Sequence, residues 1–486
     1  MRSIGHFIGG KEVKGTSGRT ADVFEPMTGD VQAKVALASK AEVRAAVENA
    51  RAAQGEWAAT NPQRRARVMM KFVELVQRDY DKLAELLARE HGKTVPDAKG
   101  DIQRGLEVAE FACGIPHLMK GEYTEGAGPG IDIYSMRQPL GVVAGITPFN
   151  FPAMIPMWKF APAIACGNAF ILKPSERDPG VPMALAQLMI EAGLPAGILN
   201  VVNGDKEAVD AILDDPDVKA IGFVGESATG SAIMAQGAPT LKRVHFELGG
   251  KNPVIVFDDA DLDRALDAVV FMIYSLNGER CTSSSRLLVQ ESIAGKFVEK
   301  LTARVKALKV GHPLDPATEI GPLIHERHLA KVCSYFDVAK KDGATIAVGG
   351  KPHDGPGGGH YVQPTLVTGA NANMRVAQEE VFGPFLTVIP FKDEREAIEI
   401  ANGVQYGLTG YVWTGEMGRA LRVADALEAG MIWLNSENVR HLPTPFGGMK
   451  SSGIGRDGGD YSFDFYMETK HVSLARGTHK IQKLGI

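Results

Sequence analysis

The sequence predicts an α/β fold with a doubly wound, largely parallel sheet. From Leu140 onward, short and almost continuously apolar runs alternate with segments of helical periodicity. Such runs are typical of parallel strands that helices cover on both faces. Glycine, at 55 residues, is frequent enough for many tight turns between strands and helices. A chain of 486 residues also allows about two to four domains.

The elements are expected in the following order. After a short strand-like segment, apolar residues recur at helical spacing over 41–56, 62–91 and 100–119. Strands that lead into helices are predicted at 140–147, 169–173, 198–204 and 220–225. After Lys251 the alternation resumes, with strands predicted at 253–257, 286–290, 345–350, 386–391, 408–413 and 430–435. The glycine-rich segments 126–130 and 354–360 are typical of hairpin tips.

Composition excludes several classes of protein. With 44% hydrophobic residues and a net charge of −5, the chain lacks the basic excess expected of a protein that binds nucleic acid or an anionic membrane. The N-terminus has no apolar signal-peptide core, and the near-apolar run 160–172 is too short to span a bilayer. Four scattered cysteines form neither a disulfide framework nor a zinc motif. A cytoplasmic protein without a metal is expected, and His325 and His328 are expected on a helix surface.

Cys281 is the candidate nucleophile. It lies in NGERCTSSSR, among polar and cationic residues, whereas Cys113, Cys166 and Cys333 have apolar neighbours typical of core residues. Polar surroundings with free backbone N–H groups lower a thiol pKa, and a thiolate attacks carbonyl carbon well. The alternative is a partly exposed cysteine without a role.

Two further side chains suit carbonyl chemistry. Glu247, within VHFELGG, has apolar neighbours, and desolvation raises a carboxyl pKa toward the range of a general base. Asn150, within TPFNFP, is an amide on a stiff turn that could bind an oxyanion together with the backbone N–H of Cys281. The alternatives are a surface glutamate at a strand end and a turn-forming asparagine.

A nucleotide site is indicated where two predicted strands end. ILKPSE places Lys173 and Glu176 after one strand, and GFVGESATG places Gly225 and Gly230 between another strand and a helix. A glycine turn at a helix N-terminus can bind phosphate, and a carboxylate at the next strand end can hold ribose hydroxyls. This pattern is not GxGxxG, so by itself it is a weak indication.

Taken together, TPFNFP, ILKPSE, GFVGESATG, FELGGK, NGERCTSSSR, EEVFGP and TPFGGMKSSGIGRDGG occur in the order and spacing of the aldehyde dehydrogenase superfamily, which the chain resembles over almost its whole length. The resemblance implies a Rossmann-type NAD-binding domain, an α/β catalytic domain and a small β oligomerisation arm. The NAD-binding domain is expected at 1–119, 141–247 and 446–469. The catalytic domain is expected at 248–445, and the arm at 120–140 and 470–486, giving a homodimer or homotetramer.

The resemblance also implies a mechanism for an aldehyde substrate. Cys281 attacks the aldehyde, hydride passes to NAD, and water activated by Glu247 releases a carboxylic acid, while Asn150 stabilises the oxyanion. Lys159 and Glu468 match a pair proposed as a proton relay. The residues expected at the cofactor are Thr147, Pro148, Phe149, Trp158, Lys173, Ser175, Glu176, Gly225, Glu380 and Phe382.

Two acidic residues bear on the cofactor. The carboxylate of Glu176 suits two ribose hydroxyls and would repel a 2′-phosphate, so NAD is expected rather than NADP. Glu226 departs from the family pattern, which has a small Ser or Gly there. A carboxylate at that point is unfavourable for a pyrophosphate unless it is directed to solvent.

The two halves resemble different branches of the family. Residues 4–220 are similar to methylmalonate-semialdehyde dehydrogenase, a CoA-acylating enzyme. From about residue 222 the chain is closer to 5-carboxymethyl-2-hydroxymuconate-semialdehyde dehydrogenase, which is hydrolytic. The CoA-acylating branch lacks a glutamate at the position of Glu247, so hydrolysis is predicted. A CoA-dependent acyl transferase and a catalytically silent NAD-binding protein are the alternatives.

Both branches act on aldehydes that carry a carboxylate. Arg440, Arg104 and Phe446 are therefore expected at the substrate, since a guanidinium group can bind a carboxylate through two hydrogen bonds. The alternative for each arginine is a surface ion pair.

Overall fold

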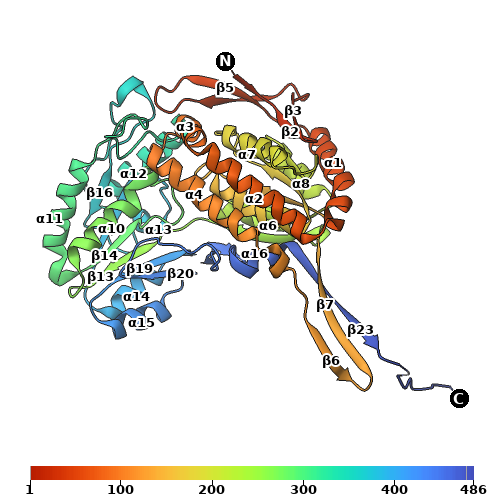
Figure 1. Ribbon diagram of the computed structural model, residues 1–486. Coiled ribbons are helices and arrows are strands. Elements are labelled where there is room, and N and C mark those ends of the chain that lie inside the picture. Colours follow the sequence, from red (N-terminus) through yellow and green to blue (C-terminus); the bar gives the residue numbers. More distant parts are fainter. Residues whose placement is uncertain (1, 478, 486) are drawn as a thin grey trace.

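The chain folds into two α/β lobes, from which a narrow β arm projects (Figure 1). The computed structural model describes residues 2–477 and 479–485. Met1, in the first predicted domain, and Thr478 and Ile486, in the predicted arm, lie outside the described residues. The predicted α/β class with a Rossmann-type sheet is confirmed.

The first lobe is built on an eight-stranded sheet with the order β22-β12-β11-β8-β9-β10-β2-β3. Its five central strands are parallel, and the order β10-β9-β8-β11-β12 is that of a Rossmann sheet. These strands are β8 (Val142–Ile146), β9 (Ala169–Lys173), β10 (Leu199–Val201), β11 (Val218–Val224) and β12 (Arg243–Glu247). The edges add β2 (His6–Ile8), β3 (Lys11–Val13) and β22 (Gly453–Ile454) in antiparallel pairing.

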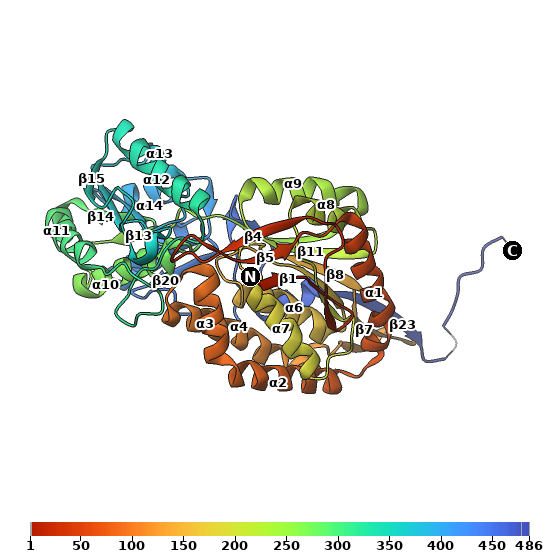
Figure 2. The same cartoon turned by 90° about the horizontal axis from the view of Figure 1, so that it is seen from above.

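Helices cover both faces of this sheet. Figure 2 shows α8 (Lys206–Asp214) and α9 (Ser227–Gly237) on one side of the strands, and α6 (Met154–Cys166) and α7 (Gly180–Glu191) on the other. Every residue of α6 is buried, because the helix lies between the sheet and α4 (Val95–Ala112). A helix that is apolar on all sides belongs in such a core position.

The N-terminal helices begin at side-chain caps. Ser39 and Glu42 form a capping box at the start of α1 (Lys40–Ala59), and Asn61 caps α2 (Pro62–Arg78). The predicted helical run 62–91 is divided at Asp79, where α3 (Tyr80–His91) begins. The lobe also contains α5 (Ile115–Leu118), α16 (Gly459–Tyr466) and a small sheet of β1 (Arg2–Ile4), β4 (Thr20–Phe24) and β5 (Val31–Ala36).

The second lobe contains a seven-stranded sheet with the order β15-β16-β17-β14-β13-β19-β20, which is parallel except at β15. Its strands are β13 (Pro253–Val256), β14 (Arg286–Gln290), β15 (Thr345–Val348), β16 (Thr365–Thr368), β17 (Phe385–Phe391), β19 (Thr409–Trp413) and β20 (Met431–Leu434). Its helices are α10 (Leu262–Tyr274), α11 (Glu291–Ala307), α12 (Glu326–Lys341), α13 (Arg375–Gln378), α14 (Glu394–Asn402) and α15 (Met417–Ala426). The sequence did not predict β16, a short strand with a threonine at each end. Segment 354–360 lies in a loop closed by the bridge between Pro352 and Val362.

The arm is a three-stranded antiparallel sheet of β6 (Tyr123–Gly128), β7 (Ile131–Pro139) and β23 (Met467–Ala475). The 126–130 segment forms the tip between β6 and β7. Strand β23 begins at Met467, ahead of residue 470, where the arm was expected to resume. Of the helices in the described part of the chain, none has both the length and the apolar composition that a membrane span needs.

Candidate active site

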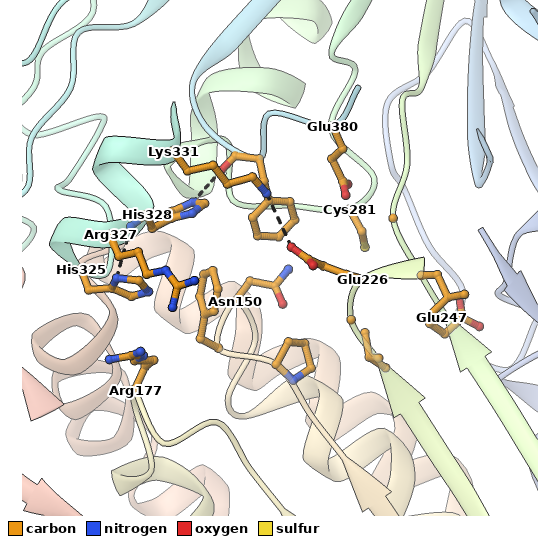
Figure 3. A pocket seen from close by; sticks show the side chains of 17 residues that line it. Asn150, Arg177, Glu226, Glu247, Cys281, His325, Arg327, His328, Lys331 and Glu380 are labelled. Atoms are coloured by element: carbon orange, nitrogen blue, oxygen red, sulfur yellow. Dashed lines mark hydrogen bonds and ion pairs between the residues drawn. The ribbon is translucent and has the colours of Figure 1, made fainter. Parts of the chain in front are cut away.

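A cavity of about 550 Å³ opens where β8 and β11 end side by side (Figure 3). Between these two strands the chain order of the sheet reverses, and ligands of open α/β sheets bind at such a crevice. The residues after β8 contribute Pro148, Phe149 and Asn150, and the turn after β11 contributes Gly225 and Glu226. Glu247 at the end of β12, Cys281, Glu380 and Phe382 also line the cavity. Side chains far apart in the chain therefore meet here.

Cys281 lies in a loop between the two lobes that polar contacts hold in place. The Asn252 side chain donates from Nδ2 to the carbonyl of Cys281 at 2.7 Å and to that of Ser283 at 2.9 Å. A Cβ on Gly250 would approach the Cys281 carbonyl oxygen to 2.6 Å, so the backbone passes the nucleophile only because this residue is glycine.

The backbone just before Cys281 is strained. Leu276 and Asn277 have φ of +54° and +56°, values that residues with a Cβ rarely adopt. Asn277 accepts from the N–H of Gly321 at 2.8 Å and donates to the carbonyl of Pro322 at 2.9 Å, which holds the turn. Strain of this kind collects at functional sites.

The predicted low pKa of Cys281 is wrong for this structure. Burial raises the pKa of the thiol to about 12, and Arg440 is the cation that most opposes the increase. Arg280, the neighbour that the prediction relied on, is directed away. Its guanidinium donates to Ser275 Oγ and lies 5.6 Å from the Phe271 ring centroid. Arg280 is next to Cys281 in the sequence, but its guanidinium group is not directed toward the thiol.

A buried ion pair holds the backbone of Asn150 in place. Lys93 Nζ lies 3.1 Å from Asp101 Oδ2 and donates to the carbonyl of Asn150, while Asp101 accepts from the N–H of Met154 at 2.7 Å. The side chain of Asn150 is 3% exposed, and its Oδ1 has no hydrogen-bond partner among the described residues. Figure 3 shows Asn150 and Cys281 facing the same cavity.

The Glu247 carboxylate belongs to a buried group of four side chains. Figure 3 shows it directed away from Cys281. Its Oε1 lies 3.3 Å from Nε2 of His245, whose Nδ1 lies 3.1 Å from Lys159 Nζ. Lys159 in turn donates to Asp457. As expected from its apolar neighbours, burial raises the pKa of Glu247, while His245 opposes the increase.

The predicted pair of Lys159 and Glu468 is not formed. Glu468 lies on strand β23 of the arm, with a side chain that is 60% exposed, and it pairs with Arg243 at 2.5 Å. The acid that reaches Lys159 is Asp457, which lies in the RDGG segment. Asp457 lies within the glycine-rich motif and Glu468 follows it, and only the folded chain shows which of the two acids is directed inward.

Glu380 and Phe382 line the same cavity as Asn150, and the Phe382 ring packs 5.9 Å from that of Phe149. The N–H of Gly250 donates to Glu380 Oε1 at 2.9 Å, and burial raises the pKa of Glu380 to about 7. Phe382 has φ of +62°, and its carbonyl lies 2.8 Å from His328 Nε2. The loop that carries both residues is therefore fixed by contacts at each end.

The predicted surface position of the two histidines is wrong for His328. This side chain is buried at the start of α12, 3.4 Å from Glu279 Oε1, and burial lowers its pKa to about 4. His325 caps α12 through a hydrogen bond from the N–H of His328, and both histidines line the cavity. The sequence signal for a surface helix failed because α12 begins at the cavity wall.

The cavity fits a dinucleotide. Glu226 is the N-cap residue of α9, yet its side chain does not cap the helix, so N–H groups of the first turn are left for an anion. A second hollow of about 540 Å³ continues past α9 and shares Glu226, Leu248, Lys331 and Glu380 with the first. The Glu226 carboxylate is 74% exposed and lies 3.6 Å from Lys331 Nζ, so it neither caps α9 nor is simply directed to solvent (Figure 3).

Not all of the predicted cofactor residues line this cavity. Lys173 and Glu176, at the end of β9, are paired at 3.4 Å, and Ser175 accepts from the N–H of Arg177. The N–H of Thr147 donates to the carbonyl of Lys173, which joins the ends of β8 and β9. These four residues lie next to the cavity but do not line it, whereas Arg177 does.

Trp158, which was predicted at the cofactor, does not line the cavity of about 550 Å³. Its ring packs against Phe446 at 4.9 Å between centroids, and its Nε1 donates to the carbonyl of Arg104. Phe446 and Arg440 line a separate cavity of about 250 Å³ formed by residues 430–446. Trp158 therefore belongs with the predicted substrate residues.

Three arginines gather near this side. Burial, together with the charges of Arg104 and, to a smaller extent, Arg280, lowers the pKa of Arg440 to about 9. Their hydrogen bonds go to neutral partners, such as Asn438 Oδ1 at 2.9 Å from Arg440 Nε. Arg440 Nη1 and Arg280 Nε are buried without a partner among the described residues. An anionic ligand would satisfy the Arg440 group, which lines the cavity of about 250 Å³, whereas Arg280 lines neither this cavity nor the one of about 550 Å³.

Comparison with known proteins identifies the family. The sequence profile of the Aldehyde dehydrogenase family matches residues 13–472. A malonate-semialdehyde dehydrogenase of Pseudomonas aeruginosa is 42% identical over 463 residues, which cover 94% of this chain and 92% of that protein.

Two solved structures have the same fold. A Sinorhizobium meliloti 1021 protein, solved with NAD and provisionally described as a methylmalonate-semialdehyde dehydrogenase, is 48% identical, with a TM-score of 0.96 over 99% of both chains. HpcC from Thermus thermophilus is 43% identical, with a TM-score of 0.97 over 100% of this chain and 95% of that chain. Both similarities extend over the whole chain rather than one half. The chain belongs to the aldehyde dehydrogenase family and is an NAD-dependent aldehyde oxidoreductase.

Proposed function

We propose that this enzyme oxidises a semialdehyde that carries a carboxylate, and that it releases the product as the free acid by hydrolysis. The observation that carries the proposal is the meeting of Cys281, Asn150 and Glu247 in one cavity at the switch point of the first sheet. The similarity to a malonate-semialdehyde dehydrogenase supports the substrate class.

The residues of the chain suit each step. Cys281 attacks the carbonyl carbon as a thiolate, forming a thiohemiacetal whose oxyanion accepts from the Asn150 amide and the N–H of Cys281. NAD, when bound, supplies the hydride acceptor. Glu247 takes a proton from water, the water oxygen bonds to the thioester carbon, and the carbon–sulfur bond breaks to leave the acid and the Cys281 sulfur.

The unpaired arginines support the choice of an anionic substrate. The Arg440 guanidinium packs on the Phe446 ring, and its Nη1 is buried without a partner among the described residues. A substrate carboxylate could accept a hydrogen bond from this nitrogen. Arg104 is close enough for its positive charge to lower the pKa of Arg440, and so adds to the charge that would attract an anion. The attraction between a substrate carboxylate and these arginines is stronger in the protein than in water, because the buried surroundings screen the charges less.

For the cofactor, we propose NAD rather than NADP. Lys173, Ser175 and Glu176 would hold the adenosine ribose, Gly225 and the start of α9 the pyrophosphate, and Glu380 and Phe382 the nicotinamide riboside. Glu176 is paired with Lys173 at 3.4 Å, and a 2′-phosphate on a ribose bound there would be repelled by its carboxylate. Thr147, Pro148 and Phe149 complete the floor and wall.

CoA-dependent release of an acyl-CoA is the second candidate, because one of the similar structures is described as a methylmalonate-semialdehyde dehydrogenase. The experiment is turnover of carboxylated, aromatic and aliphatic aldehydes with NAD or NADP, with and without CoA, followed by absorbance of the reduced cofactor. Hydrolysis predicts full turnover without CoA and free acid as product. Reduced cofactor that stays at one equivalent until CoA is added would support acyl transfer instead.

Two variants make the assignment specific. Cys281→Ala should abolish oxidation while NAD binding is kept, and an active variant would favour the silent binding protein. Glu247→Gln should keep one rapid equivalent of reduced cofactor but slow later turnover by about 10²–10⁴-fold, the usual contribution of a general base. Fast continued turnover of Glu247→Gln would remove Glu247 from the mechanism.

We also propose how the chain is organised. Residues 1–119, 141–247 and 446–469 would form the cofactor domain, residues 248–445 the catalytic domain, and residues 120–140 and 470–486 the oligomerisation arm, a division that the separate sheets support. Exposed Leu474 on the projecting strand β23 favours pairing across subunits in a homodimer or homotetramer. Light scattering measures the state. Four unpaired cysteines suit the reducing cytoplasm.

A further inference from the structure

His245 contacts two members of the buried group behind the cavity that the proposed mechanism does not otherwise explain. It lies two residues before Glu247 on β12, so both side chains leave the same face of the strand. The imidazole is 2% exposed, and its two nitrogens face different partners. Nδ1 lies 3.1 Å from Lys159 Nζ, and Nε2 lies 3.3 Å from Glu247 Oε1.

The partner on one side determines which nitrogen carries the proton. An ammonium group can only donate, so Nδ1 of His245 must accept from Lys159. Nδ1 therefore has its lone pair free, and in the neutral ring the proton is on Nε2. Nε2 lies 3.3 Å from Glu247 Oε1 without forming an aligned hydrogen bond. Neither this nitrogen nor either carboxylate oxygen has a hydrogen-bond partner among the described residues, so the two groups are left to each other.

The group is not a metal site, although His245, Glu247 and Asp457 could place one ligand atom each within 4.8 Å of one another. Lys159 already supplies the cation, because it donates to Asp457 and lies beside His245 Nδ1. The four side chains form a compact group, in which Asp457 Oδ2 also lies 3.7 Å from His245 Nδ1.

Asp457 and Lys159 both act on the Glu247 carboxyl group through their charges, Asp457 raising its pKa and Lys159 lowering it. Of the other titratable groups around these side chains, none forms a hydrogen bond with Glu247 in the described part of the chain. Tyr466 packs from α16, and burial raises the pKa of its hydroxyl well above the ordinary value, so it stays neutral. Arg456, in the segment before α16, donates to the carbonyls of Gly448 and Gly455. The Phe465 ring packs against the His245 imidazole, with 5.6 Å between the ring centroids.

We propose that His245 is a positioning residue for deacylation: its Nε2–H holds the Glu247 carboxylate in the position away from Cys281 and keeps it ionised between turnovers. Without this donor, a carboxylate in so dry a place would take up a proton and could not act as a base. The inference rests on the proposed role of Glu247.

The test compares His245→Leu, which removes both nitrogens, with His245→Gln, whose amide N–H can replace the Nε2–H. The substrate is p-nitrophenyl acetate, which acylates Cys281 without hydride transfer, so the burst of nitrophenol reports acylation and the later rate reports deacylation. Both phases are measured from pH 5 to 9, and thermal unfolding shows whether each variant is folded.

In His245→Leu we expect an unchanged burst and an acid limb of deacylation shifted about one pH unit upward, so that the rate below the limb falls about tenfold. His245→Gln should restore most of the wild-type profile. The inference is overturned if the limb does not move in His245→Leu, or if both variants lose burst and turnover alike at every pH, as a merely structural role predicts.

Glu247→Gln, measured in the same assay, separates this inference from the proposed function. If Glu247→Gln deacylates as fast as the wild type, the base itself is wrong. If it stops at the burst while His245→Leu keeps the wild-type limb, only the role of His245 is wrong.

Discussion

The guanidinium carbon of Arg440 lies 4.4 Å from the centroid of the Phe446 ring. The same guanidinium lies 5.8 Å from the Trp158 ring, so two aromatic residues fix its plane. Its Nη1 stays buried without a partner among the described residues, while Nε is held by Asn438. A fixed, planar and unsatisfied cation next to the nucleophile is suited to select a substrate by charge.

The first prediction concerns this selection. Arg440→Met should raise KM for a carboxylated aldehyde about 30-fold, since a hydrogen bond to a charged group contributes roughly 2 kcal/mol. KM for a neutral aldehyde of equal length should change little. Arg440→Lys is the matched control, because it keeps the charge but loses the planar stack. Its KM for the carboxylated aldehyde should lie between those of the wild type and Arg440→Met. Equal losses for both aldehydes in Arg440→Met would exclude a charge-selecting role.

The second prediction follows from the dry surroundings of Cys281. Because burial raises its thiol pKa to about 12, the free enzyme holds far less thiolate at pH 7 than an ordinary thiol with a pKa near 8.5. Alkylation of Cys281 by iodoacetamide should therefore rise about tenfold per pH unit without a plateau up to pH 9. Peptide mass spectrometry measures this, with Cys281→Ser as the blank. A plateau below pH 8 would show that the thiolate forms before any ligand binds.

The third prediction concerns Glu226, the N-cap residue of α9 that does not cap the helix. Glu226→Ser should stabilise α9 by about 1 kcal/mol through a serine cap, and it also removes a carboxylate from the edge of the cofactor groove. NAD should bind several-fold more tightly, with little change in kcat. Isothermal titration measures the affinity.

Glu226→Gln serves as the control for Glu226→Ser, because it removes the charge without adding a good cap. If both variants bind NAD as the wild type does, the pair of Glu226 with Lys331 leaves the pyrophosphate position undisturbed.

The fourth prediction is a pH dependence of stability. Burial raises the pKa of Glu279 to about 8, and the carboxyl group lies 3.4 Å from His328 and 3.8 Å from His91. In the unfolded chain the same group ionises near its ordinary value of about 4.5. The folded state therefore loses stability as the pH rises from about 4.5 to about 8.

Glu279→Gln should remove this loss. Its melting temperature should differ little from that of the wild type at pH 5 and should exceed it by a few degrees at pH 8. Calorimetry across this range is the measurement, and Glu110→Gln on the exposed face of α4 should give a constant difference. A Glu279→Gln curve parallel to the wild type would show that the Glu279 carboxylate is ionised in the folded protein.

Much of the site could be predicted from local sequence. Glu247 ends an apolar strand and Asn150 follows one, and the carboxyl ends of parallel strands meet at one edge of a sheet. Cys281 lies in the polar loop between α10 and strand β14, where its neighbours in sequence distinguish it from the other cysteines. The strands around them were predicted for the same reason, since near-continuous apolar runs are buried on both faces. His245 could also have been found, because a residue two positions before Glu247 on a strand must share its face.

The errors concern contacts between segments far apart in the chain. Arg280 follows Glu279 directly before Cys281, yet its side chain turns to Ser275 and Phe271, and the cation that matters most to the thiol comes from residue 440. Lys159 could have paired with the acid within the glycine-rich motif or with the one after it, and packing of α6 against the sheet brings it to Asp457. The place of Trp158 in the sequence of α6 does not show whether its ring faces the cofactor or the substrate. Only its packing against Phe446 decides between these two positions.

The class of fold, the order of the strands along the chain and the three candidate reacting side chains could be inferred from the sequence, because they depend on periodicity and on residues adjacent in the chain. The tertiary structure alone decided the protonation of those side chains and their partners. Burial and the distance to charges set a pKa, and both depend on which distant segments the fold brings together.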